Sequence, residues 1–342
     1  MNSYQNFSDL GPEERLKIIW RFIEQRIPIL LLGPAGSGKS YMGFRIMRKF
    51  IETYLDPDTR IVSLREIDEL ETGSLGEIKA LYVSGSANVT KLDLLGGRTL
   101  YKGEYVRRTG ILQKMMKNGG IIFLDEVTSL PPQFTILLNE IIDNIYKGTA
   151  HENFYIFFAG NPSYYLGANE LPDALLERLT LIWFDHYPLE VEVEIVIKMI
   201  KNKKLRINCD SEEFEVFVRY IVSLLRMIRK TLQKEQENIP ISVRSMYLAV
   251  LNTLNHRNKG SIEIKDKDKT AIYYILKGKT PENLTEVAED QQVEKLIKFM
   301  RENRINWNHI KAGIQSLGIL SKVTRNELLD EIISLIPSKN KK

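Results

Sequence analysis

A glycine-rich stretch near the N-terminus has the residue types and spacing of a phosphate-binding loop. Residues 33–40 read Gly-Pro-Ala-Gly-Ser-Gly-Lys-Ser, which fits GxxxxGK followed by serine or threonine. The glycines let backbone N–H groups turn toward phosphates, Lys39 reaches the β- and γ-phosphates, and the Ser40 hydroxyl ligates Mg²⁺. The alternative is a glycine-rich turn whose lysine binds no phosphate. A strand is expected before the loop and a helix after it, and this context disfavours the alternative. The pattern predicts that ATP is bound by Gly33, Pro34, Ala35, Gly36, Ser37, Gly38, Lys39, Ser40 and Tyr41.

A second acidic motif follows an apolar run. Residues 121–124 are Ile-Ile-Phe-Leu, and Asp125 and Glu126 come directly after them. Asp125 can hold Mg²⁺, directly or through water, and Glu126 can polarise the water that attacks the γ-phosphate. The alternative is a helix-capping aspartate beside a surface glutamate. The phosphate loop upstream favours the functional interpretation.

The elements that must position these motifs alternate along the first half of the chain. Short apolar runs predict strands at residues 28–33, 81–86, 120–125, 154–160 and 179–184. Helices are expected at 13–25, 41–54, 110–117, 132–146 and 172–178. Nearly continuous apolar strands separated by helices are typical of a parallel sheet covered on both faces. Residues 55–79 are polar and mixed, and the sequence does not assign them.

The pattern changes after Pro188. We expect an α/β nucleotide-binding domain over residues 1–188, an α-helical lid domain over 189–285, and a more polar helical C-terminal extension of unknown role over 286–342.

Composition indicates an ordinary globular protein. The net charge of +4 on 342 residues is mild, and lysine and arginine are spread through the chain, so nucleic-acid contact is permitted but not favoured. The single cysteine, Cys209, excludes an intrachain disulfide. The N-terminus lacks the apolar core of a signal peptide, and no apolar run approaches the length of a membrane span. A cytoplasmic location is expected.

Further motifs resemble those of a known family. Residues 125–140 (DEVTSLPPQFTILLNE) resemble the Walker B region of AAA+ ATPases of the MoxR and CbbQ/NorQ/GvpN group, a dynein-related, helix-2-insert clade. Four more stretches agree, in order: LDLLGG at 92–97, TGILQKMMKNGG at 109–120, AGNPSYYLG at 159–167 and LPDALLERL at 171–179. One departure is Leu179, where the family usually has phenylalanine.

The resemblance implies a fold and further site residues. The fold would be a P-loop AAA+ three-layer α/β sandwich with a parallel sheet of order 5-1-4-3-2, followed by an α-helical lid. Asn161 would be sensor 1, Arg178 an arginine finger for a neighbouring subunit, and Arg244 the sensor 2 of the lid. The respective alternatives are an Asn-Pro turn that ends a strand, an exposed arginine at a helix end, and a surface arginine after a Ser242 helix cap.

Residues 98–106 lie where this clade carries a β-hairpin that faces a central pore. Lys102 and Gly103 sit at a turn between two β-favouring runs. Tyr101 and Tyr105 would then touch a threaded or docked partner. A small surface hairpin without such a role is the alternative.

The resemblance also implies a function. It implies a ring homo-oligomer, most simply a hexamer, that couples hydrolysis of Mg²⁺-bound ATP to remodelling or activation of a client or adaptor protein, often one with a von Willebrand A domain. Two rivals remain: a nucleic-acid-stimulated motor of the translocase or restriction type, and a slow nucleotide-gated switch. The complete set of Lys39, Asp125, Glu126 and Arg178 disfavours the switch.

Overall fold

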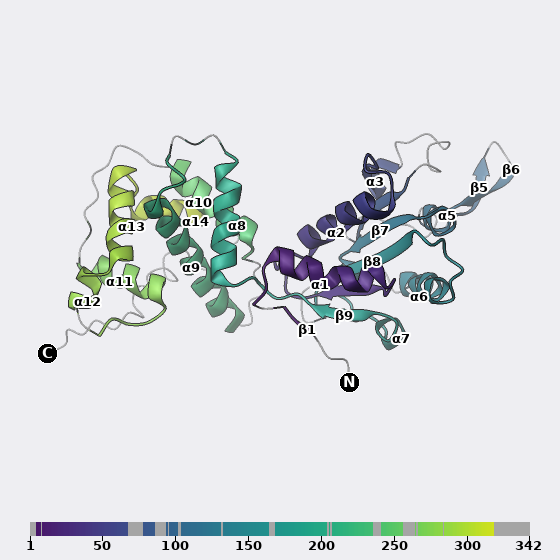
Figure 1. Cartoon of the computed structure of the whole chain (residues 1–342), viewed down its shortest axis with the longest axis horizontal. Coiled ribbons are helices and arrows are strands. Elements are labelled where there is room, and N and C mark those ends of the chain that lie inside the picture. The colour runs from purple at the N-terminus through teal and green to yellow at the C-terminus, as the bar shows by residue number, and fades with distance from the viewer. Residues whose placement is uncertain are drawn as a thin grey trace. The chain divides into compact units, whose positions relative to one another are not determined.

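The chain folds into two compact units, Met1–His186 and Tyr187–Lys342. The computed structural model describes residues 5–317 except 8, 68–77, 86–93, 95, 102–103, 131–132, 164–167, 204, 206, 235–240, 256–263, 265 and 283. The first unit combines a sheet with helices and the second is helical (Figure 1). The division lies close to the boundary expected at residue 188.

A parallel sheet forms the centre of the α/β unit. Its described strands are β1 (Gln5–Asn6), β2 (Ile29–Leu32), β3 (Ile61–Ser63), β4 (Ala80–Ser84), β7 (Gly120–Asp125), β8 (Phe154–Gly160) and β9 (Thr180–Trp183). They lie in the order β1-β9-β2-β8-β7-β4-β3, and all neighbouring pairs are parallel. The inner five strands have the expected order 5-1-4-3-2, so the predicted fold is confirmed. The short strands β1 and β3, which the sequence did not predict, extend the two edges.

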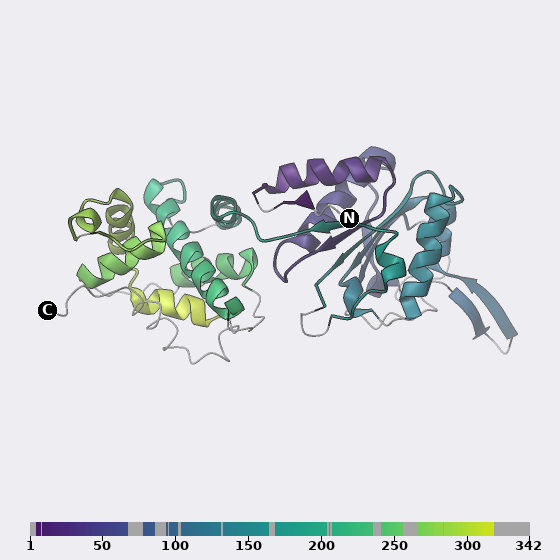
Figure 2. The same cartoon turned by 90° about the horizontal axis from the view of Figure 1, so that it is seen from below.

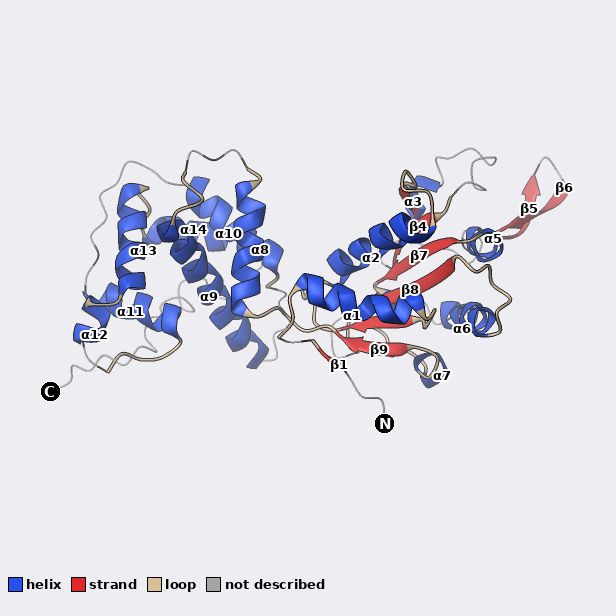
Figure 3. Cartoon of the chain, in the orientation of Figure 1, coloured by secondary structure: helices blue, strands red, loops and turns tan. Residues whose placement is uncertain are grey.

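Helices cover both faces of this sheet (Figures 2 and 3). On one side lie α1 (Pro12–Glu24) and α2 (Lys39–Tyr54). On the other lie α5 (Ile111–Asn118), α6 (Gln133–Tyr146) and the short α7 (Asp173–Leu176), while α3 (Leu64–Ile67) directly follows β3. α1 begins with proline at its first turn and buries an apolar stripe, Leu16, Ile19, Trp20 and Ile23, as its spacing predicts.

Side chains of β7 point alternately to the two faces of the sheet, and the packing differs between these faces. Ile122 and Leu124 belong to the aliphatic core shared with α5, α6 and α7. Phe123 points to the opposite face, where its ring stacks on Phe157 of β8 at 4.6 Å and meets Phe44 of α2 edge-on at 6.1 Å. Because successive strand residues face opposite sides, one buried strand serves both layers.

The expected hairpin is confirmed. β5 (Gly96–Tyr101) and β6 (Glu104–Thr109) pair antiparallel, with Arg98 opposite Arg107. Figure 1 shows this pair extending from the α/β unit next to α5. The expected turn residues Lys102 and Gly103 lie outside the described residues.

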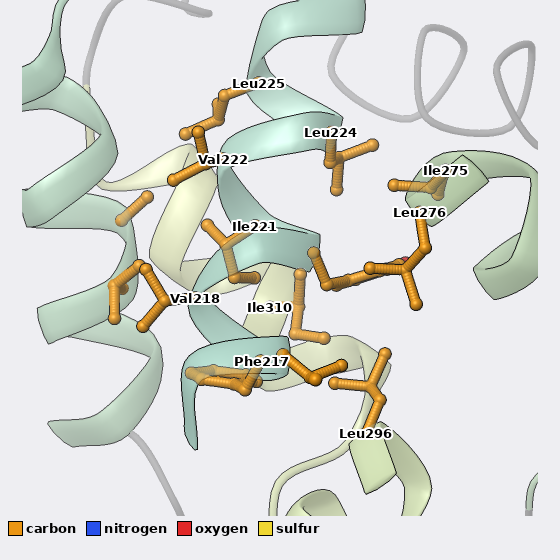
Figure 4. Packing of buried hydrophobic residues seen from close by; sticks show 14 of the residues in the cluster. Phe217, Val218, Ile221, Val222, Leu224, Leu225, Ile275, Leu276, Leu296 and Ile310 are labelled. Carbon is orange, nitrogen blue, oxygen red and sulfur yellow. The ribbon is translucent and has the colours of Figure 1, made fainter. Parts of the chain in front are cut away.

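The second unit contains α8 (Leu189–Lys201), α9 (Glu212–Lys234), α10 (Val243–Asn255), α11 (Asp266–Lys277), α12 (Leu284–Ala288), α13 (Gln291–Glu302) and α14 (Trp307–Gln315). α9 is the central helix of its core. Figure 4 shows Phe217, Ile221 and Leu224 of α9 among Ile275, Leu276, Leu296 and Ile310 from three other helices. The described part of residues 286–342 therefore shares one core with the expected lid.

A buried ion network joins helices within this unit. Glu192 of α8 has no exposed surface and accepts hydrogen bonds from Arg226 and Arg229 of α9. Arg226 also donates to the Tyr187 carbonyl, and Arg229 to the Ile241 carbonyl just before α10. The network thus fixes the first residue of the unit and the entry to α10.

Among the described residues, no helix has the length and apolar character that crossing a bilayer requires.

Candidate functional site

The glycine-rich loop connects β2 to α2 in the centre of the sheet. Gly36 and Gly38 have φ angles of +79° and +95°, in the left-handed region that favours glycine. Gly33 is confined by packing, because a Cβ there would lie 2.1 Å from the Phe184 carbonyl oxygen. The loop therefore needs glycine at each of these positions, and it places α2 so that the helix N-terminus opens onto the loop.

Lys39 turns back over this loop. Its Nζ donates to the carbonyl oxygens of Gly33 at 2.8 Å and Pro34 at 2.7 Å, and to Asn161 Oδ1 at 3.0 Å. The side chain is only 7% exposed. Burial lowers the pKa of Lys39 from its usual 10.5 to about 8, while the charges of Asp125 and Glu126 act in the opposite direction. The ammonium group thus donates only to neutral oxygens among these bonds, and the negative charges of Asp125 and Glu126 act on it electrostatically.

Asp125 ends β7 with its carboxylate buried, at 5% exposure. Its Oδ1 accepts the backbone N–H of Glu126 at 3.0 Å, and its Oδ2 accepts the hydroxyl of Tyr82 from the neighbouring strand β4 at 3.4 Å. These bonds fix the direction of the carboxylate. Burial, and then the negative charge of Asp125, raise the pKa of Tyr82, so its hydroxyl remains a donor.

Glu126 has a left-handed backbone with φ of +53°, an uncommon conformation for a residue with a side chain. Gly85, which follows β4, packs directly against it, because a Cβ at Gly85 would lie 2.3 Å from the Glu126 carbonyl oxygen. Gly85 also donates its N–H to the Asp125 carbonyl at 2.8 Å. This role of Gly85 was not predicted from the sequence. A glycine directly after the strand that pairs with β7 was the available signal.

Asn161 directly follows β8, so it lies at the carboxyl edge of the sheet between the ends of β2 and β7. Its Oδ1 accepts from Lys39, and its backbone N–H donates to Thr128 Oγ1 at 3.2 Å. The structure thus brings Lys39, Asp125, Glu126 and Asn161 to one place, as expected for parallel strands whose carboxyl ends meet. Thr128 was not identified from the sequence.

Ser40 and Tyr41 occupy the first turn of α2 and are exposed. The hydroxyl of Ser40 and the carboxylate of Asp125 are the oxygen ligands that Mg²⁺ prefers, and two protein ligands with phosphate oxygens form a common Mg²⁺ environment. No group of three or more His, Cys, Asp or Glu side chains with metal-binding arrangement occurs in the described part of the chain.

Arg178 makes its hydrogen bonds to residues outside the cluster of Lys39, Asp125, Glu126 and Asn161. It follows α7, and its Nε donates to Asp143 Oδ1 of α6 at 2.9 Å. Its Nη1 donates to the Ala174 carbonyl, and its own carbonyl accepts the hydroxyl of Tyr146. The Arg178 side chain is 34% exposed. The guanidinium is held at the surface by an ion pair within its own subunit.

Arg244 belongs to the helical unit and is exposed on the first turn of α10. The expected helix cap is present, because Ser242 Oγ accepts the backbone N–H of Ser245 at 3.2 Å. Tyr164, Tyr165, Leu166 and Gly167, which complete the expected sensor 1 motif, lie outside the described residues, as do residues 86–93.

Part of the chain matches a known protein family. Residues 72–179 match the AAA domain of the dynein-related subfamily. The matched segment contains Asp125, Glu126, Asn161 and Arg178, whereas the glycine-rich loop precedes it.

Individual relatives agree with this match. The protein CbbQ of Hydrogenophilus thermoluteolus is 27% identical over 184 residues, which cover 50% of this chain and 58% of CbbQ. The gas vesicle ATPase GvpN of Haloferax mediterranei is 24% identical over 226 residues, covering 62% of this chain and 59% of GvpN. The chain thus spans less than two thirds of the length of these relatives. The expected resemblance to the MoxR and CbbQ/GvpN group is confirmed.

Among solved structures, domain III of the Thermotoga maritima replication initiation protein DnaA is similar, with a TM-score of 0.41 and 14% identity. The similarity covers 86% of this chain and 95% of that domain.

Proposed function

We propose that this chain, which carries an AAA domain of the dynein-related subfamily, is a magnesium-dependent ATP hydrolase that works as a ring and remodels or activates a partner protein. The observation that carries the proposal is the buried Lys39 ammonium. It lies between the carbonyl oxygens of the glycine loop and Asn161, within the field of Asp125 and Glu126. A lysine held in this way is suited to meet phosphate charge.

Each residue of the cluster has a step in this reaction. The loop N–H groups and Lys39 bind the phosphates, and Ser40 and Asp125 would hold Mg²⁺. When bound, Mg²⁺ neutralises charge on the phosphate oxygens. Glu126 accepts a proton from the attacking water, and Asn161 holds that water toward the γ-phosphate.

A neighbouring subunit would complete the site. The Arg178 side chain is partly exposed, and its guanidinium is held by Asp143. An arginine that approaches the γ-phosphate from another subunit stabilises transition-state charge and can raise kcat by about 10³-fold or more. This arrangement requires a ring, which we propose to be a hexamer, with Arg244 of the lid as a further phosphate contact.

The partner is proposed to be a protein, for example one with a von Willebrand A domain, contacted through the β5–β6 hairpin. The relatives support the energy source, since the name of GvpN describes an ATPase. Nucleic acid as an alternative client is an outcome that the experiment distinguishes.

The test combines two variants that we expect to be inactive when each is measured alone. Glu126→Gln keeps Arg178 but lacks its own base, and Arg178→Ala keeps Glu126 but lacks the arginine for its neighbour. If the site is shared, mixing them restores a measurable fraction of wild-type ATPase, because some interfaces combine an intact Glu126 with an intact Arg178. The wild-type rate per subunit should also rise with protein concentration.

Lys198→Ala, an exposed change on α8, is the matched control and should retain the wild-type rate. No ATPase in the wild type at any concentration would contradict the hydrolase. An Arg178→Ala variant with the wild-type rate would contradict the shared site. Stimulation by DNA that declines as salt rises would indicate a nucleic-acid client instead of a protein.

A further inference from the structure

A buried threonine links the acidic turn to Asn161. Thr128 lies in the short 3-10 helix η2 (Val127–Ser129), directly after Glu126, and is only 3% exposed. Its Oγ1 accepts the backbone N–H of Asn161 at 3.2 Å. The two residues are 33 positions apart in the sequence, and the bond joins the turn after β7 to the residue after β8. A side-chain hydroxyl therefore makes the connection where the sheet ends.

The strand register explains why a side chain is needed there. The β7–β8 ladder reaches Leu124 opposite Phe158, and β7 then leaves the sheet at Glu126 with its left-handed φ. Asn161 lies beyond the last paired residue, so its N–H faces a position where β7 no longer supplies a carbonyl. A backbone N–H that is withdrawn from water without finding an acceptor is unfavourable. The Thr128 hydroxyl takes the place of the missing strand partner.

Packing holds Thr128 in this position. Gly160 provides the space, because a Cβ there would lie 2.9 Å from Thr128 Cγ2. The Thr128 carbonyl in turn accepts the N–H of Asn169 at 2.6 Å. The side chain is thus pressed against β8 on one side, and its backbone is tied to the segment that leads to α7 on the other.

We propose that Thr128 is a positioning residue, which sets the Asn161 side chain relative to Lys39 and to the water that Glu126 activates. The proposal rests on the ATPase function proposed above. Asn161 is the first residue after β8, so a shift of its backbone moves the Oδ1 atom that Lys39 contacts. Because Glu126 and Thr128 share one turn, the same turn fixes both the base and Asn161.

The test compares two substitutions of Thr128. Thr128→Val keeps the shape but removes the hydroxyl, and Thr128→Ser keeps the hydroxyl but removes the methyl group. We expect the valine variant to lose about tenfold or more in kcat, because small misplacements at a reacting centre are costly. Its Kd for ATP should change less than about threefold, and the serine variant should recover most of kcat.

The matched control is Thr253→Val in the helical unit. Thr253 is also fully buried, and its Oγ1 donates to the Ala249 carbonyl at 2.7 Å. This variant loses an equivalent buried hydroxyl far from Asn161 in the sequence and should lower stability without lowering kcat. If Thr253→Val lost as much kcat as Thr128→Val, the loss would reflect a general effect on folding, and the positioning role of Thr128 would be contradicted.

A second measurement does not depend on activity. Hydrogen exchange at the Asn161 amide, followed by NMR, should be faster in Thr128→Val and close to wild type in Thr128→Ser. An unchanged Asn161 amide in the valine variant would overturn the positioning role, whatever the ATPase shows. A wild type without ATPase, but with the expected exchange pattern, would instead contradict the proposed function and leave the Thr128–Asn161 contact standing.

Discussion

The Lys39 ammonium illustrates what one buried charge does in this fold. Its Nζ donates to neutral oxygens of Gly33, Pro34 and Asn161, and burial lowers its pKa from 10.5 to about 8. Between these two pH values the unfolded chain binds more protons than the folded chain at this residue. The free energy of unfolding therefore rises with pH from about 8 to 10.5, and below pH 8 the buried charge costs stability.

The first prediction concerns ATP binding. The negative charge of the ATP phosphates should reverse the lowering of the Lys39 pKa. ATP binding raises the pKa of Lys39, so binding takes up a proton above pH 8 and takes up none through this group near pH 7. The affinity should then fall by up to about tenfold per pH unit above 8. Isothermal titration calorimetry without divalent metal, in buffers of different ionisation enthalpy, measures the proton uptake.

Two lysine variants make this prediction specific. Lys39→Arg places a guanidinium that stays charged over the whole range, so any ATP binding that remains should show no proton uptake at pH 9. Lys49→Arg, on the same helix with its ammonium over the Trp20 ring, should behave as the wild type. Equal uptake at pH 9 in all three proteins would assign the titration to a different group.

At the residue scale the sequence predicted the types of group but not their partners. Lys39 and Asp125 were expected at one nucleotide site from the phosphate loop and the acidic strand end, and Asn161 was expected there from the family resemblance. The bonds of Thr128 to Asn161 and of Arg178 to Asp143 were not predicted. Both join residues more than thirty positions apart, and the register between strands and helices that creates them leaves no trace in local periodicity.

At the scale of elements, the contact between α2 and β7 determines where the glycine loop lies. Gly43 of α2 faces the Phe123 ring, and a Cβ at Gly43 would lie 2.2 Å from that ring. Phe123 cannot easily move, because it is fully buried and stacked on Phe157. The helix approaches the sheet this closely only because residue 43 has no side chain.

Gly43→Ala is therefore predicted to destabilise the protein, although alanine favours helices by up to about 1 kcal/mol over glycine. Overpacking typically costs 1–3 kcal/mol, so we expect a net loss of about 1–2 kcal/mol in the free energy of unfolding, measured by urea denaturation. Glu52→Ala, exposed on the same helix, should stay within about 0.5 kcal/mol. A more stable Gly43→Ala protein would show that α2 lies farther from β7.

The elements that the sequence missed share a physical cause. β1 has two residues and β3 has three, and both lie at edges of the sheet. Such short segments carry too few residues for a period of two to be visible, and their pairing depends on a neighbour that is far away in sequence. The inner strands β7 and β8, in contrast, are buried along their whole length, so their continuous apolar runs predicted them.

The ion network of the helical unit gives a third prediction. Glu192 compensates Arg226 and Arg229, and replacing one partner of a buried ion pair leaves uncompensated charge. We expect Glu192→Gln to lower the stability of this unit by about 3–5 kcal/mol. Glu194→Gln, on the same helix with only an exposed pair to Lys198, should cost less than about 0.5 kcal/mol. Similar losses in both variants would indicate that the network is solvated.

At the scale of the molecule, the chain has two units with separate hydrophobic cores. The sequence indicated the change from alternating strands and helices to helices alone, because that change alters the period of the apolar residues. It also suggested a separate extension from residue 286, since those residues are more polar. Polarity alone is a poor guide here: Val293, Leu296 and Phe299 form a narrow buried stripe on α13 within an otherwise charged helix.

Two cores predict two unfolding transitions in calorimetry, and this provides a test of Arg244. Gly43→Ala should lower the transition of the α/β unit and Glu192→Gln that of the helical unit, which assigns the two peaks. In a Glu126→Gln background, Mg²⁺ and ATP at about 100 times Kd stabilise a binding unit by about 2.7 kcal/mol. For units of this size the shift is about 5–10 °C.

If Arg244 contacts the nucleotide, both transitions shift, and Arg244→Ala removes the shift of the helical unit while the α/β transition still moves. Arg301→Ala, an exposed change on α13, should retain both shifts. A helical transition that ATP never moves in the parent protein would contradict the sensor 2 role of Arg244. The test of Arg244 uses the transition of the helical unit, and binding of ATP by Lys39 and Asp125 is measured by the transition of the α/β unit. The two roles can therefore fail independently.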